Sequence, residues 1–163
     1  MLITSALETI SKEFGEEIEA AFLDSEYKCD YEIDFHSNYT GIWFYREDRK
    51  FVKIGFQFQA KNRELLYGFT KHYNDFGDAI QIPRALELAL SQLGNNIKKE
   101  NGWWPWRQYV EVPYGDWTKG EAWHAIQNGT MLNMIQYHVK TLSDLVADEK
   151  LALLMQGEEV EKV

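Results

Sequence analysis

The sequence predicts an α+β fold: an antiparallel sheet of four to five strands, with an N-terminal helix and C-terminal helices packed on one face. Three observations predict it. Residues 5–24 and 130–154 carry apolar side chains at helical spacing, residues 31–70 alternate apolar and polar side chains, and short polar turns separate the alternating runs. Such short connections favour antiparallel pairing, because parallel strands need longer crossovers.

The first helix is expected from Ser5 to about Asp24. Ser5 and Glu8 have the spacing of a capping box, in which the two side chains bond backbone N–H groups at the helix start. The apolar stripe that follows comprises Leu7, Ile10, Phe14, Ile18 and Phe22. Gly15 costs the helix interior about 1 kcal/mol relative to alanine, so this helix needs a packing partner.

Alternation then predicts a series of strands. Strands are expected at residues 31–36, 42–45, 51–59, 65–70 and 107–112, with turns at 38–41, 47–50 and 61–64. The last of these strands is separated from the others by a loop and a helix.

Three further helices are expected. One begins at about residue 80 or at Pro83, since proline fits only the first turn, and runs to Leu93. A second capping box, Thr118 with Glu121, opens a short helix, and Thr130 caps the last helix. The inner stripe of the last helix comprises Met131, Met134, Ile135, His138, Leu142 and Leu145.

Composition limits the class of protein. At 163 residues the chain predicts one domain at 1–156, followed by a flexible charged tail at 157–163. An apolar run long enough for a membrane span is missing, and the first residues lack the features of a signal peptide. A single cysteine, Cys29, is typical of a reducing compartment. The sequence therefore predicts a cytoplasmic protein that does not enter a membrane.

Charge is unevenly distributed along the chain, whose net charge is −9. Residues 1–34 have a balance of −8, whereas residues 46–71 have a balance of +4. The candidate binding cations are Arg46, Arg49, Lys50 and Lys53. Such a basic stretch can attract phosphate. It can also pair with the acidic first helix of the same chain, and the overall acidity favours this second interpretation.

Tryptophan is the most unusual feature, because five of the six tryptophans lie within the 21 positions from Trp103 to Trp123. Trp103, Trp104, Trp106 and Arg107 are candidate binding residues, since exposed indoles stack on bases, sugars or partner loops. The alternative is that these indoles fill the core, where each large aromatic buries about 150–250 Å². Alternation places Trp104 and Trp106 on one strand face, so the expectation is a core anchor from which one or two indoles reach solvent.

Catalytic motifs are weak. The four histidines and Cys29 lack metal-site spacing, and nucleotide-binding and hydrolase motifs are missing, so neither a metal nor a cofactor is expected. The carboxylates Glu32 and Asp34 share a strand face with His36, as the solvated face of an acidic strand would. Asp34, Gln59 and Lys61 follow the order of a metal-dependent nuclease, but Gln59 replaces a carboxylate and would weaken a hard-cation site. The sequence therefore favours a non-enzyme.

The order of aromatic motifs resembles the C-terminal region of bacterial and phage proteins of the PD-(D/E)XK nuclease superfamily. The motifs are Phe51-Val52-Lys53-Ile54-Gly55-Phe56-Gln57-Phe58, Leu66-Tyr67-Gly68-Phe69, Trp104-Pro105-Trp106 and Trp117-Thr118-Lys119-Gly120-Glu121-Ala122-Trp123. They are aromatic spacings without catalytic signatures, so the resemblance implies an accessory region that lacks the catalytic core.

The resulting hypothesis is a non-catalytic accessory or binding domain of a nuclease-like protein that engages nucleic acid or a protein partner. The first alternative is a degenerate metal-dependent nuclease that uses Asp34, Gln59 and Lys61. The second is a domain for protein–protein interaction or oligomerisation.

Overall fold

The computed structural model describes residues 2–34, 38–47, 49–59, 61, 63–71, 82–94, 97–98, 103–117 and 119–147, and it confirms the α+β class. The helices are α1 (Leu2–Ala21), α2 (Arg84–Ser91), α3 (Gly120–Gln127) and α4 (Thr130–Leu145). The strands are β1 (Lys28–Glu32), β2 (Asn38–Arg46), β3 (Arg49–Gln59), β4 (Glu64–Lys71), β5 (Ile97–Lys98) and β6 (Trp106–Tyr109).

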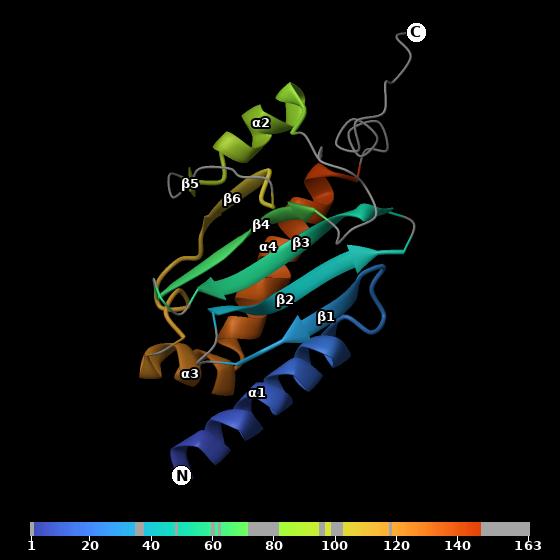
Figure 1. Ribbon diagram of the computed structural model, residues 1–163. Coiled ribbons are helices and arrows are strands. Elements are labelled where there is room, and N and C mark those ends of the chain that lie inside the picture. The colour runs from blue at the N-terminus through green and yellow to red at the C-terminus, as the bar shows by residue number, and fades with distance from the viewer. Residues whose placement is uncertain are drawn as a thin grey trace, which may run out of the picture.

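The strands form one antiparallel sheet in the order β1-β2-β3-β4-β6-β5. The first four strands are the predicted meander. The predicted fifth strand is β6, which pairs with β4, and the two-residue β5 adds a further strand at that edge. Figure 1 shows α1 alongside β1 at the opposite edge. A helix at this position protects an edge strand from pairing with other chains.

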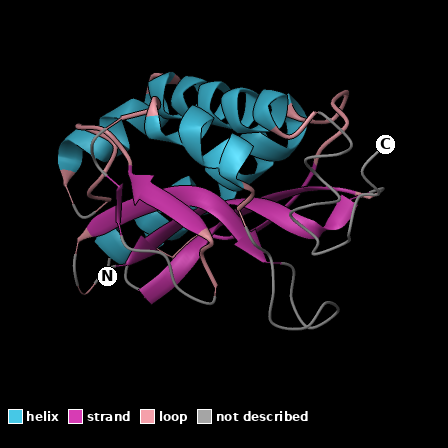
Figure 2. Cartoon of the chain, turned by 90° about the horizontal axis from the view of Figure 1, so that it is seen from above, coloured by secondary structure: helices cyan, strands magenta, loops and turns pink. Residues whose placement is uncertain are grey.

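The helices lie mainly on one side of the sheet (Figure 2), with α4 behind the central strands in Figure 1. Apolar side chains from the strands and helices form one core between these layers. From α1 the core receives Phe14 and Ile18, followed by Phe22 just after the helix, and from α4 it receives Met131, Met134, Ile135, Val139 and Leu142. The helical stripes read from the sequence therefore face the sheet. Within the described residues, no helix has the length and apolar character to cross a bilayer.

Several strand boundaries differ from the prediction: β1 begins at Lys28, β3 begins at Arg49 and β6 ends at Tyr109, where residues 31, 51 and 112 were expected. The first strand ends at Glu32, three residues before Phe35, and residues 35–37 lie outside the described part. The predicted turn at 38–41 is instead the start of β2. Tyr39 has a positive φ of 63°, and the β2–β3 register shifts between Asn38 and Thr40. A local irregularity of this kind adds a residue without ending the strand.

The three predicted helix caps are wrong. Helix α1 begins at Leu2, upstream of Ser5. Lys119 occupies the N-cap position of α3, without a side-chain cap. Gly129, with φ of 84°, precedes α4, and Thr130 is the first helical residue. Capping residues identify a possible start, but packing decides where each helix begins.

Candidate binding surface on the outer face of the sheet

Alternation along β2 places aromatic side chains on both faces of the sheet. Ile42 and Phe44 are fully buried in the core, and the ring centroid of Phe44 lies 4.5 Å from that of Phe22, the residue after α1. Trp43 and Tyr45 therefore project from the opposite face, where both are half-buried. We call Asp30, Trp43, Tyr45, Lys53 and Gln57 the outer-face patch.

Lys53 is held at the centre of the outer-face patch by two neighbours. Its Nζ lies 5.0 Å from the ring centroid of Tyr45 and 3.4 Å from Oδ2 of Asp30. Only 14% of the Lys53 side chain is exposed. Burial raises the pKa of Tyr45, and the negative charge of Asp30 adds to this effect, so Tyr45 is a neutral phenol at neutral pH. The patch is therefore aromatic and locally charge-balanced.

Trp104 and Trp106 lie on opposite faces of the sheet, which corrects the prediction that they share one face. Trp106 is in the core, with ring centroids 5.9 Å from Tyr67 and 6.4 Å from Phe69. The indole of Trp104 lies over Gly55 on the outer face, beside Trp43. The alternation argument fails because β6 begins only at Trp106, so Trp104 precedes the regular strand.

Trp103 and Arg107, the other two candidate binding residues near these tryptophans, differ in how far their side chains are exposed. Trp103 is 49% exposed, and it is the one indole of the three that extensively reaches solvent. Arg107 is buried, and this burial lowers the pKa of its guanidinium, partly offset by the charge of Glu64. Trp103 thus remains a surface candidate, whereas Trp104, Trp106 and Arg107 are packed into the two faces of the sheet.

Two of the four candidate cations, Arg46 and Lys53, pair with acids of the N-terminal region. Arg46 Nη1 lies 3.1 Å from Glu26 Oε2, just as Lys53 contacts Asp30. Both acids belong to the acidic residues 1–34, although they follow α1 and do not lie within it. Nothing is described for the side chains of Arg49 and Lys50.

The weak catalytic candidates lie at one end of the sheet. Asp34 follows β1 and its backbone N–H donates to Thr40 Oγ1 at 2.7 Å, Gln59 ends β3, and Lys61 lies in the next turn. His36 lies outside the described residues. Among the residues described, no group of three His, Cys, Asp or Glu side chains is placed to hold a metal ion.

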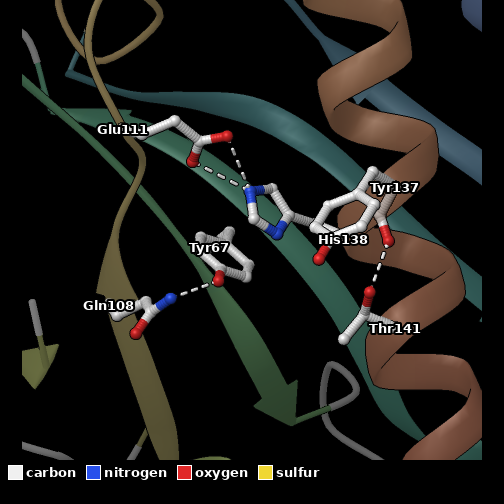
Figure 3. A network of polar contacts seen from close by, with 6 residues as sticks. All are labelled: Tyr67, Gln108, Glu111, Tyr137, His138 and Thr141. Carbon is white, nitrogen blue, oxygen red and sulfur yellow. Dashed lines mark hydrogen bonds and ion pairs between the residues drawn. The ribbon is translucent and has the colours of Figure 1, made fainter. Parts of the chain in front are cut away.

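A polar network that the sequence did not predict joins α4 to the segment after β6 (Figure 3). His138 Nε2 lies 2.9 Å and 3.2 Å from the two carboxylate oxygens of Glu111. The His138 ring stacks on Tyr67 at 4.0 Å, and Gln108 Nε2 donates to the Tyr67 hydroxyl. Burial raises the pKa of Tyr67 to about 12, despite the opposing hydrogen bond from Gln108. The sequence placed His138 in the inner stripe of the last helix, but it did not identify Glu111 as its partner, because the two residues are 27 positions apart.

The outer-face aromatics were also missed as candidate residues. The run Ile42-Trp43-Phe44-Tyr45 carried a signal, because four consecutive apolar or aromatic residues give a strand aromatic side chains on both faces.

Comparison of the chain with protein-family models, with curated proteins and with solved structures finds no significant match.

Proposed function

We propose that this chain is a non-catalytic binding domain that engages a macromolecular partner through the outer-face patch and the exposed Trp103. One observation carries the proposal. Helices cover one face of the sheet, while β2 presents half-buried Trp43 and Tyr45 on the other. Large, rigid aromatic side chains of this kind supply contact area at low entropic cost, and they dominate binding energy at protein interfaces.

The charges favour a protein over nucleic acid as the partner. Arg46 and Lys53, the two candidate cations whose side chains are described, are already paired with Glu26 and Asp30. The net charge of −9 also opposes the approach of a polyanion. Nucleic acid is the alternative partner, and the cations Arg49 and Lys50 would then contribute.

The resemblance described above supports a cytoplasmic accessory domain of a PD-(D/E)XK nuclease-like protein.

Photo-crosslinking in cells tests the protein partner. A benzoylphenylalanine placed at Tyr45 is expected to crosslink to one discrete protein. The same residue at Tyr137 is the matched control, because Tyr137 is an exposed tyrosine on α4, in the helical layer. Trp43→Ala should remove the Tyr45 crosslink without changing the thermal unfolding temperature by more than a few degrees. Equal crosslinking from both positions would contradict a specific outer-face interface.

Fluorescence anisotropy tests the nucleic-acid alternative. Single-stranded and duplex DNA and RNA oligonucleotides are titrated with the protein at low salt. If nucleic acid is the partner, the combined substitutions Arg49→Glu, Lys50→Glu and Lys53→Glu should weaken binding and flatten its salt dependence. Absence of binding to all of these oligonucleotides would remove the alternative.

A plasmid-nicking assay with Mg²⁺ or Mn²⁺ tests the degenerate nuclease. We expect no nicking above background, because Gln59 supplies no negative charge for a hard cation. Metal-dependent nicking that disappears in Lys61→Ala would show that the domain is catalytic.

A further inference from the structure

A recess in the surface lies away from the outer-face patch. It is a cleft of about 410 Å³ between the start of β4, the end of β6, the following loop and the start of α3. Its volume falls within the usual range of about 300–1,000 Å³ for small-ligand pockets. The residues that matter for its chemistry are Arg63, Leu65, Tyr109, Val110, Lys119 and Glu121.

The inner part of the cleft is apolar and held in place by the sheet. Leu65 and Val110 are almost completely buried, and the Val110 N–H donates to the Leu65 carbonyl at 2.9 Å. Tyr109 and Val112, which also line the cleft, are exposed at 37% and 91%. Apolar surface that remains accessible inside a recess can bind an apolar group of a ligand.

The charged residues around this apolar surface differ in whether they have partners. Glu64 and Asp116 line the cleft and each interacts with another group of the chain. By contrast, in the part of the chain that is described, the side chains of Arg63, Lys119 and Glu121 form no hydrogen bond or ion pair. Arg63, Lys119 and Glu121 are therefore the charged side chains of the cleft that remain available to a ligand.

We propose that this cleft binds an α-carboxylate whose neighbouring side chain is large and apolar, as in an apolar amino acid or the C-terminal residue of a peptide. Arg63 and Lys119 bind the carboxylate, since guanidinium and ammonium groups form charge-assisted hydrogen bonds with it. The apolar side chain contacts Leu65, Val110 and Tyr109. Glu121 is available for an ammonium group when the ligand is a free amino acid.

Isothermal titration calorimetry with four probes tests the proposal. The probes are N-acetyl-phenylalanine, its uncharged amide, free phenylalanine and a tripeptide that ends in phenylalanine. N-acetyl-phenylalanine should bind about tenfold more tightly than its amide, because only the acid can use both cations. Tighter binding of free phenylalanine supports an amino-acid ligand, and tighter binding of the tripeptide supports a C-terminal peptide.

Charge-removing variants locate the binding site. Arg63→Gln and Lys119→Gln should each weaken the binding of N-acetyl-phenylalanine by about tenfold. Lys140→Gln is the matched control, because Lys140 is an exposed lysine on α4 that pairs with Asp144. Equal affinity for the acid and the amide, or no binding of any probe at about 10 mM, would overturn the proposal. Loss of the Tyr45 crosslink would leave this result unchanged, since the two surfaces share no residue.

Discussion

Gly15 allows the ring of Tyr31 to lie directly on α1. A Cβ atom at Gly15 would overlap Cε2 of Tyr31 and lie 2.7 Å from its Cδ2 and Cζ atoms. The residue that weakens the helix interior on propensity alone therefore permits a contact between α1 and β1.

A double-mutant cycle with Tyr31 tests this role. In the wild-type background, Gly15→Ala should give no net stabilisation, because displacing the Tyr31 ring offsets the gain in helix propensity. In a Tyr31→Ala background, the same change should stabilise the protein by about 1 kcal/mol. Urea unfolding measures both values. The same effect in the two backgrounds would show that Tyr31 does not constrain this position.

Gly68 is required by the close approach of two backbones. A Cβ atom there would overlap the carbonyl oxygen of Trp106 and lie 2.8 Å from the Cα atom of Arg107. Backbone atoms of a paired strand cannot move aside as a side chain can. Gly68→Ala should therefore destabilise the protein by about 1–3 kcal/mol or more. Urea unfolding measures this loss, and Gly120→Ala is the control, because a Cβ atom at Gly120 meets nothing within 4 Å. If Gly120→Ala destabilised the protein as much as Gly68→Ala, the explanation would be contradicted.

Glu111 and His138 give the stability a dependence on pH. The hydrogen bond from His138 lowers the pKa of the Glu111 carboxyl below its ordinary value of 4.5, and burial opposes this shift. A lowered folded-state pKa means that the carboxylate contributes stability above pH 4.5, and that this contribution is lost as the pH falls through the folded-state pKa.

Glu111→Gln should therefore destabilise the protein at pH 6, and the difference from wild type should shrink as the pH is lowered toward 3. Urea unfolding at several pH values measures it. Glu121→Gln serves as the control, because it removes an exposed carboxylate that has no partner in the described residues. A difference for Glu111→Gln that stays constant down to pH 3 would exclude this contribution.

Trp117 connects three elements from the loop before α3. It is completely buried, with ring centroids 5.4 Å from Phe58 of β3 and 6.5 Å from Phe14 of α1. Its carbonyl accepts a hydrogen bond of 2.6 Å from Trp123 Nε1 in α3. The Trp117 side chain thus packs between α1 and β3, and its backbone carbonyl binds α3.

Trp117→Ala should cost about 3–5 kcal/mol, because it removes a large buried side chain and leaves a cavity. Trp103→Ala is the control and should change stability by less than about 0.5 kcal/mol, since Trp103 is 49% exposed. Thermal unfolding of the two variants measures the difference. Similar unfolding temperatures would show that Trp117 does not join these elements.

The molecule as a whole separates its two faces by composition. The helix-covered face receives Phe44 of β2 with Phe56 and Phe58 of β3, and the outer face receives indole, phenol, amide and charged groups. Period-two alternation along the strands produces this separation directly. Because Glu26 and Asp30 pair with Arg46 and Lys53, the outer face is suited to a partner that makes aromatic contacts and does not rely on phosphate attraction.

Local pattern determined most of the fold. Periodicity in residues 5–24 and 130–154, and alternation in residues 31–70, predicted the class and the buried face of β3, because each pattern depends only on neighbouring residues. Exact boundaries were not determined. Tyr39 continues β2 through an irregularity, and Lys119 and Gly129 precede helices in place of the expected capping residues.

Only the tertiary structure decided where the candidate site residues lie relative to one another. Trp104 and Trp106 are two residues apart, yet they pack on opposite faces because the strand begins between them. Lys53 meets Asp30 across 23 residues, and His138 meets Glu111 across 27. The sequence by itself determined the apolar stripes of α1 and α4 and the apolar face of β3, since these follow from backbone period. Pairing between distant residues depends on strand order and register, which no local pattern contains.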